Sequence, residues 1–140
     1  MKIIFLDIDG VLNNCQAIGI FHETSTIQIC VEILNFIIEE TGAYIIIISS
    51  WKDDFDFEST IKPLLYNRGI KSDSILGCTE KNMMKELGIM KYLAENLVDG
   101  FVIVDDSLEL EDSDLNYQYI KTNTHTGLVA EDIDKIIAKL

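Results

Sequence analysis

Acidic and hydroxyl side chains stand directly after three apolar runs of this sequence. The first run leads into Asp7-Ile8-Asp9-Gly10, the second into Ser49-Ser50 and the third into Asp105-Asp106. Carboxylates that gather at one place repel each other and need a cation, and hard oxygen ligands of this kind suit Mg²⁺. A metal-held carboxylate can attack phosphorus, and a second acid can protonate the leaving oxygen. These residue types predict phosphoryl transfer, provided that the three runs end at the same place.

The apolar runs themselves are predicted to be strands of a sheet. Residues 2–8, 43–48 and 100–104 are mostly apolar and rich in β-branched side chains, as expected of strands that are covered on both faces. Shorter strand signals lie at residues 74–78 and 118–121.

Apolar residues at helical spacing predict helices between these strands and after the last one, and one of the helices is interrupted by the single proline, Pro63. The helices are expected over residues 27–41, 58–68, 83–97 and 131–140. Gly42 follows the first of them, where a helix C-terminal glycine belongs. In the third, one face is expected to bring together Met83, Leu87, Met90, Ala94 and Leu97.

Strands that alternate with helices predict an α/β three-layer sandwich around a mainly parallel sheet. In such sheets ligands bind at the carboxyl ends of strands, where the strand order reverses. The three polar motifs follow strands, so they are expected at that edge. Asp and Gly also favour turns, so a DxDG by itself is compatible with a surface turn. The order of all three motifs along the chain is what favours a site.

The length, composition and net charge of the chain limit its domain organisation and the partners that it can bind. The chain of 140 residues has the length of one domain, and it has no repeat and no Gly/Ser-rich linker, so residues 1–140 are expected to fold as a single unit. Lys and Arg number 11 and Asp and Glu 24, which gives a net charge of −13. This charge disfavours extended binding to nucleic acid or to an acidic membrane surface.

Cysteine usage and hydropathy indicate a reducing, non-membrane setting. The three cysteines, Cys15, Cys30 and Cys78, are odd in number and form no CxxC, which supports neither a disulfide framework nor a zinc site. Asp7 and Asp9 interrupt the N-terminal apolar run too early for a signal peptide, and no run reaches the ~20 residues of a membrane helix. We therefore expect a cytoplasmic protein.

The motifs resemble those of the haloacid dehalogenase (HAD) superfamily of phosphohydrolases. Phe5-Leu6-Asp7-Ile8-Asp9-Gly10-Val11-Leu12 is similar to its first motif, Ser49 to the second, and Val102-Ile103-Val104-Asp105-Asp106 to the acidic fourth. Within the superfamily, the sequence most resembles the small HAD domain of Swiss army knife RNA-repair proteins. That closer resemblance rests on Glu39-Glu40-Thr41-Gly42-Ala43, Ser49-Ser50-Trp51-Lys52 and Thr126-Gly127-Leu128.

The resemblance implies a HAD-like (Rossmannoid) fold and roles for the acidic residues. Asp7 would be the nucleophile and a Mg²⁺ ligand. Asp9 would be the general acid and base, with its backbone carbonyl on the metal. Asp105 would complete the metal site, and Asp106 would bind metal waters or the lysine of the third motif.

The resemblance also implies groups that bind the phosphate. The lysine of the third motif is assigned to Lys85, with Lys81 as the alternative. Ser49 would hydrogen-bond the transferred phosphoryl group, although Ser50 could do so instead, and either serine could simply cap the following helix. Lys52 stands where the relatives usually have Arg, and Lys keeps the charge but loses the bidentate geometry. Gly10 and Ser50 are expected beside the substrate.

Besides Lys52, the sequence departs from the family pattern at three further positions. Lys85 and Tyr92 stand where those relatives have Arg and a Trp-Leu pair, and Ala130 stands where a Ser/Thr helix cap is expected. Trp51 could stack on a substrate ring, but packing is the simpler interpretation. The acidic residues after Asp106 are expected to form a solvated loop, because they lack EF-hand spacing.

Taken together, these expectations predict a Mg²⁺-dependent phosphatase that works through an aspartyl-phosphate. The insertion points at residues 10–26 and about 70–82 are too short for a folded cap, so the site should be open to a phosphorylated small molecule or a nucleic-acid end. Two other classes remain open: a receiver-like phospho-aspartate signalling domain and a catalytically silent HAD fold that binds a protein. Receivers usually place two adjacent acidic residues after the first strand. Here the adjacent acidic residues, Asp105-Asp106, come late in the chain.

Overall fold

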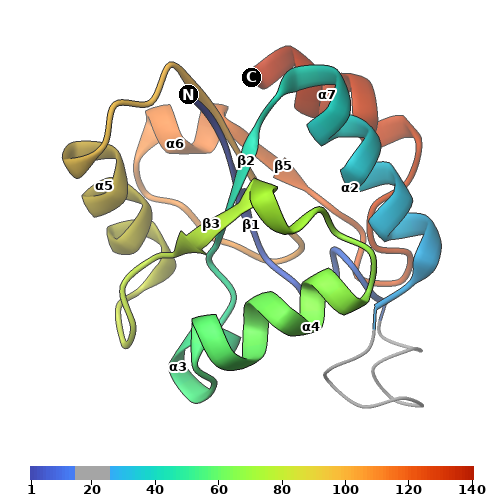
Figure 1. Cartoon of the computed structure of the whole chain (residues 1–140). Helices are drawn as coiled ribbons and strands as arrows, with labels where there is room; N and C mark the ends of the chain where they lie inside the picture. Colours follow the sequence, from blue (N-terminus) through green and yellow to red (C-terminus); the bar gives the residue numbers. More distant parts are fainter. Residues whose placement is uncertain (15–25) are drawn as a thin grey trace.

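A parallel sheet forms the centre of the molecule (Figure 1). The computed structural model describes residues 1–14 and 26–140. Five strands in these ranges pair in parallel, in the order β3-β2-β1-β4-β5. Their bounds are β1 (Lys2–Leu6), β2 (Tyr44–Ile47), β3 (Ile75–Cys78), β4 (Gly100–Asp105) and β5 (Tyr119–Lys121).

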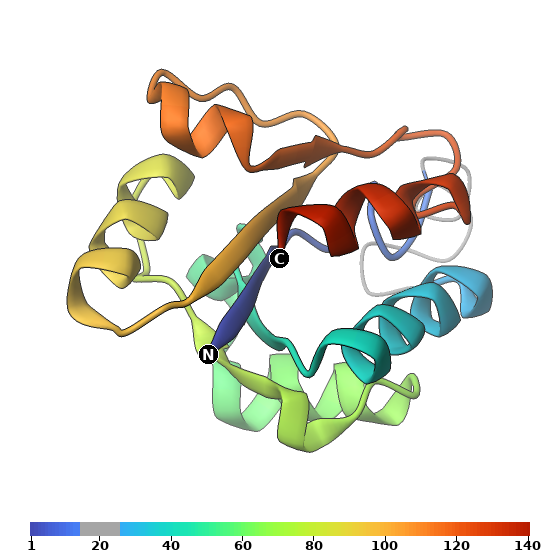
Figure 2. The ribbon, with the colours of Figure 1, turned by 90° about the horizontal axis from the view of Figure 1, so that it is seen from above.

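Helices cover both faces of the sheet, which confirms the predicted α/β three-layer sandwich (Figures 1 and 2). One face is covered by α2 (Gln28–Thr41), α4 (Lys62–Asn67) and α7 (Glu131–Lys139), and the other by α5 (Lys85–Glu95) and α6 (Ser113–Tyr117). Three shorter pieces complete the described elements: α3 (Trp51–Asp54), the π-helical turn η1 (Phe57–Ile61) and the 3₁₀ turn η2 (Ser72–Ser74). We call the first side the broad face and the second the narrow face.

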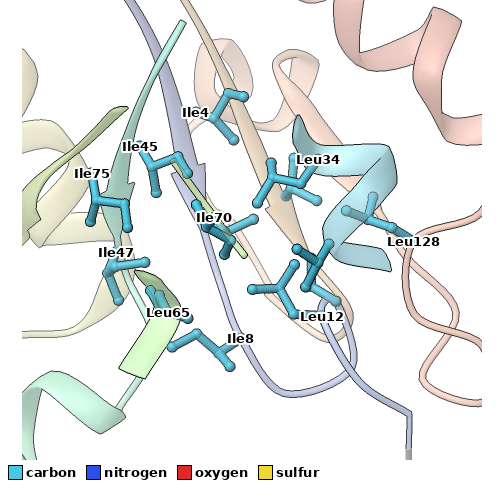
Figure 3. Packing of buried hydrophobic residues seen from close by; sticks show 14 of the residues in the cluster. Ile4, Ile8, Leu12, Leu34, Ile45, Ile47, Leu65, Ile70, Ile75 and Leu128 are labelled. Carbon is cyan, nitrogen blue, oxygen red and sulfur yellow. The ribbon is translucent and has the colours of Figure 1, made fainter. Parts of the chain in front are cut away.

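Alternate side chains of each central strand enter the two faces. In β1, Ile4 and Leu6 pack into the broad face, whereas Ile3 and Phe5 pack into the narrow one. All four are fully buried, as expected of a parallel strand with helices on both sides. Figure 3 shows the broad-face core, in which Leu34 of α2 meets side chains of the sheet and of the segments around it.

The first predicted helix matches α2 closely. Gly42 ends it with a left-handed φ of 69°, and the Gly42 N–H donates to Ile38 O over 2.8 Å. The helix predicted over residues 58–68 is divided instead into η1 and α4, with Pro63 in the first turn of α4. A proline lacks the N–H that a helix interior needs but fits a first turn, so the division falls next to it.

The face predicted for helix 83–97 is wrong. Leu87 and Met90 are 52% and 44% exposed, whereas Gly88 and Ile89 are buried. The reason is close packing at Gly88, where an added Cβ would lie only 3.1 Å from Cβ of Thr79. This contact turns the opposite side of α5 toward the sheet, and the apolar residues counted from the sequence face outward.

The acidic stretch after β4 is not wholly a loop. Asp112 accepts hydrogen bonds from the N–H groups of Asp114 (2.9 Å) and Leu115 (3.0 Å), and so caps the N-terminus of α6. Leu115 is buried against the narrow face. The sequence prediction missed this helix because its five residues contain a single buried apolar side chain.

Two predictions concern residues only partly covered by the structure. Cys30 and Cys78 are free thiols, whereas Cys15 lies outside the described residues, as does most of the first insertion point at residues 10–26. Within residues 1–14 and 26–140, no helix combines the length and the apolar character needed to cross a membrane.

Candidate active site

The candidate site lies where the strand order reverses. From β1 the chain proceeds outward to β2 and β3, and then returns past β1 to form β4 on its other side. Asp7 directly follows β1, and its N–H donates to Val104 O over 3.0 Å, which extends the pairing with β4 by one residue. Asp105 is the last residue of β4. The two carboxylates are thus carried by adjacent strands at the edge where α/β sheets bind ligands.

Lys85 joins these two carboxylates. Its Nζ lies 2.7 Å from Oδ2 of Asp105 and 3.3 Å from Oδ1 of Asp7. The first turn of α5 therefore brings a cation from the narrow face to the sheet edge. Lys81 is exposed in the turn before α5, with its charge near Asp53 and Asp56. Of the two candidate lysines, Lys85 is the one that contacts the acidic pair.

Burial and mutual repulsion disfavour negative charge on the carboxylates of Asp7 and Asp105. Burial and the neighbouring charge of Asp105 together raise the pKa of Asp7 to about 7, although Lys85 acts in the opposite direction. Burial also disfavours the charge of Lys85, but the carboxylates of Asp7 and Asp105 outweigh this effect and raise the pKa of Lys85. One lysine therefore does not fully compensate the two buried carboxylates.

Asp106 brings a third carboxylate to the same place. One oxygen each from Asp7, Asp105 and Asp106 lie within 4.8 Å of one another. Gly10 makes this approach possible, because a Cβ at Gly10 would collide with the Asp106 carboxylate. Its φ of 78° is also one that glycine adopts without strain. The glycine of the first motif thus leaves room for the acid of the fourth.

The three carboxylates fit a divalent cation. They offer hard oxygen ligands on two neighbouring strand ends, and their mutual repulsion is relieved by added positive charge. The raised pKa of Asp7 indicates the same shortage of positive charge from within the protein. Asp9 contributes no side-chain oxygen to this cluster. Its expected contact through the backbone carbonyl stays a prediction.

The Asp9 side chain is held by two groups that the sequence prediction did not assign to it. Its Oδ1 accepts from Asn13 Nδ2 over 2.9 Å, and its Oδ2 accepts from Trp51 Nε1 over 3.0 Å. Trp51 is buried, as expected for packing, but its indole N–H also orients an acid. Asn13 Oδ1 in turn accepts from the Gly10 N–H over 2.7 Å. Asn13 stands four residues after Asp9, and this short spacing is the sequence signal from which their contact could have been predicted.

The residues expected to bind phosphate differ in exposure. Ser49 is buried and its Oγ accepts from the Trp51 N–H over 3.2 Å, whereas Ser50 is exposed. Lys52 is 2% exposed, and its Nζ lies 3.3 Å from Oδ1 of Asp53. The two serines therefore differ in their surroundings: Ser49 is the buried one, and its hydroxyl oxygen contacts the backbone at the start of α3.

Residues of β5 and of the segment after it support Gly10 and the acids of the fourth motif. Thr122 Oγ1 donates to Gly10 O over 2.7 Å, and Thr124 Oγ1 donates to Asp106 Oδ2 over 2.8 Å. Tyr119 OH donates to the backbone oxygen of Asp105 over 3.1 Å, and burial together with the nearby acids raises the pKa of Tyr119 to about 12. Sequence reasoning missed these groups because threonines that follow a short edge strand carry no distinctive spacing.

Comparison with protein families identifies the family of the chain. A family described as the HAD domain in Swiss Army Knife RNA repair proteins matches residues 3–133. The chain belongs to this family. Comparisons with curated proteins and with solved structures found no match. Membership confirms the resemblance drawn from the motifs, supports a HAD-type hydrolase, and agrees with a site whose acidic cluster is compatible with a divalent metal.

Proposed function

We propose that this HAD domain is a Mg²⁺-dependent phosphomonoesterase that works through an aspartyl-phosphate on Asp7. The observation that carries the proposal is the contact of Lys85 with both Asp7 and Asp105 at the switch point of the sheet. An anionic substrate can approach three carboxylates only if their charge is compensated, and the site has a fixed ammonium to contribute. We propose the whole chain, residues 1–140, as a single phosphohydrolase domain.

The proposed reaction has two steps. In the first, a carboxylate oxygen of Asp7 forms a bond to phosphorus while the ester P–O bond breaks, and Asp9 gives its proton to the leaving oxygen. In the second, Asp9 takes a proton from water, the water oxygen attacks phosphorus, and the bond from phosphorus to Asp7 breaks to release phosphate. Bound Mg²⁺ would neutralise charge on the carboxylates and phosphoryl oxygens.

Other residues of the chain position these groups. Trp51 and Asn13 hold the Asp9 carboxylate apart from the acidic cluster, which separates the proton-transfer group from the nucleophile. Asp105 and Asp106 would hold the metal together with Asp7, and Lys85 would face the transferred phosphoryl group. Ser49 would donate to that group, and Gly10, Ser50 and Lys52 would lie along the substrate.

The surroundings of the site favour a phosphate at the end of a nucleotide or nucleic acid. A shallow hollow of about 380 Å³, lined by residues from Lys121 to His125, lies beside Asp106, to which Thr124 donates. Lys121 offers a cation and His125 a ring to a leaving group seated there. The net charge of −13 argues against binding along an extended nucleic-acid strand, so we assign a terminal phosphate.

A phosphate-release screen tests this proposal. The substrates are nucleotides, end-phosphorylated oligonucleotides, sugar phosphates and phosphopeptides, each with Mg²⁺ and with chelator. We expect turnover only with Mg²⁺ and a loss of roughly 10⁴-fold or more in Asp7→Asn, because the nucleophile is removed while its shape is kept.

The matched control is Asp54→Asn, which makes the same change on the exposed surface of α3 and should leave turnover intact. Full activity in Asp7→Asn would contradict the nucleophile. A stable phospho-Asp7 without phosphate release would indicate a receiver-like role instead.

A further inference from the structure

A groove on the narrow face has no role in the proposed reaction. It has a volume of about 890 Å³ and runs between α5 and the segment before α6, which lie on the same side of the sheet in Figure 2. Its lining combines apolar and acidic side chains: Met84, Glu86, Leu87, Met90, Glu109, Leu110, Glu111 and Asp112.

The apolar part of the groove is unusually exposed. Met84, Leu87 and Met90 are 71%, 52% and 44% exposed, and they follow one another at three-residue spacing from the N-cap of α5 into the helix. Single exposed apolar residues are common, but three that share one groove mark a contact surface. Two of them are methionines, whose flexible side chains adapt to the shape of a partner.

The groove is a built feature with a fixed wall. The Glu86 carboxylate accepts hydrogen bonds from the backbone N–H groups of Glu111, at 3.0 and 3.2 Å, and of Asp112, at 2.7 Å. Asp112 also caps α6. These bonds tie the segment before α6 to the first turn of α5, so the two walls keep their spacing without a partner between them.

The charge of the groove determines what it can bind. Glu109 and Glu111 stand exposed beside its apolar centre, and its lining includes no lysine, arginine or histidine among the residues that the structure describes. Acidic side chains repel nucleic acid and anionic lipid surfaces alike. They also repel a second copy of a chain whose net charge is −13. A positively charged polypeptide is the complement.

We propose that this groove binds a basic amphipathic helix of a partner protein. Apolar side chains at i, i+3 and i+4 spacing on that helix would pack against Met84, Leu87 and Met90, and its Lys or Arg side chains would pair with Glu109 and Glu111. Because one wall is itself a helix and none of the lining residues in the described part of the chain belongs to a strand, a helix in the groove suits the site better than an added strand. The inference does not depend on the proposed phosphatase reaction.

The test uses a synthetic probe of about 18 residues, long enough to form a helix on binding. The probe carries leucines on one helical face and lysines elsewhere, and a scrambled peptide of the same composition lacks that face. We expect saturable binding by isothermal titration calorimetry for the amphipathic peptide, at least roughly tenfold tighter than for the scrambled one.

Variants locate the binding surface on the whole chain. Leu87→Ser together with Met90→Ser should weaken binding by roughly tenfold or more, because these side chains form the apolar centre. Leu97→Ser is the matched control, since Leu97 is 93% exposed just beyond the end of α5 and does not line the groove. Glu109→Gln with Glu111→Gln should weaken binding by roughly threefold and reduce its salt dependence.

Three results would overturn the proposal. One is equal binding of the scrambled peptide, and another is an equal effect of the Leu97 control. The third is self-association of the free protein by analytical ultracentrifugation that Leu87→Ser and Met90→Ser abolish, because the groove would then serve a second copy. Circular dichroism spectra of the variants that match the wild type exclude misfolding as the cause of weakened binding.

Discussion

The two faces of the sheet differ in how many hydrophobic residues they bury and in which functional groups they carry. In the described ranges, the broad face buries 24 hydrophobic residues beneath α2, α4 and α7, and the narrow face buries seven beneath α5 and α6. The narrow face nevertheless supplies Lys85 to the acidic pair and carries the apolar groove. Most of the buried hydrophobic contacts that stabilise the fold therefore lie on the broad face. The narrow face is available for binding and for positioning charge.

The largest expected effect on stability comes from truncation in the broad face. Leu34 is 1% exposed in α2, and Leu34→Ala should lower the free energy of unfolding by about 2–5 kcal/mol, because it leaves a cavity among close-packed side chains. Leu115→Ala makes the same change in the narrow face and should cost less, since fewer buried neighbours surround it. Urea titrations of both variants measure the difference. An equal or larger loss at Leu115 would remove the distinction between the faces.

The next effect is on activity and arises from the narrow face. Lys85→Met should lower kcat/KM by about 10²–10³-fold, because it removes the only cation that contacts both Asp7 and Asp105 in the described part of the chain. Lys91→Met changes another lysine of α5, which pairs with Glu80 and Glu95 at the surface, and should leave activity unchanged. Steady-state kinetics on a phosphomonoester decide the point. Equal loss in both variants would mean that α5 acts through stability alone.

A smaller effect is expected from pH when divalent cations are chelated. The pKa of Asp7 rises from 3.8 to about 7 on folding, so between these values the folded protein holds the proton more tightly than the unfolded chain. The free energy of unfolding should therefore fall as pH rises from about 4 to 7, by on the order of 1 kcal/mol or more. Added Mg²⁺ should recover the loss at pH 7, because it favours the carboxylate.

Urea unfolding at pH 5 and pH 7.5 with EDTA measures this dependence. Asp7→Asn is the control, because an amide cannot titrate, and its stability should change less over the same interval. A wild-type protein that becomes more stable as pH rises would contradict the assigned burial of the Asp7 charge.

The smallest effect is expected at the groove. Leu87→Ala should change the free energy of unfolding by less than about 0.5 kcal/mol, since the side chain is 52% exposed and the sheet does not cover it. Thermal unfolding beside the Leu34→Ala variant gives the comparison. A loss similar to that at Leu34 would show that the groove side of α5 belongs to the core, and would remove the reason to expect a partner there.

Much of the fold could be predicted from local pattern. Continuous apolar runs such as residues 43–48 and 100–104 have few ways to be buried other than as central parallel strands. Gly42 marked the end of α2 because its left-handed conformation disfavours other residues. The outward face of α5 could not be read in this way, because its rotation depends on Gly88 meeting Thr79, which is nine residues away in sequence.

The candidate site, like the fold, could be predicted from the sequence only in part. By itself, the sequence determined that Asp7 and Asp105 would lie at strand ends on one edge of the sheet, because apolar runs fix where strands stop and parallel strands end at one edge. The structure then showed that these two strands, β1 and β4, are neighbours. Only the tertiary structure decided that Lys85 rather than Lys81 meets them, and that Trp51 holds Asp9. These contacts join segments from different layers, and their geometry depends on how helices pack on the sheet rather than on any spacing along the chain.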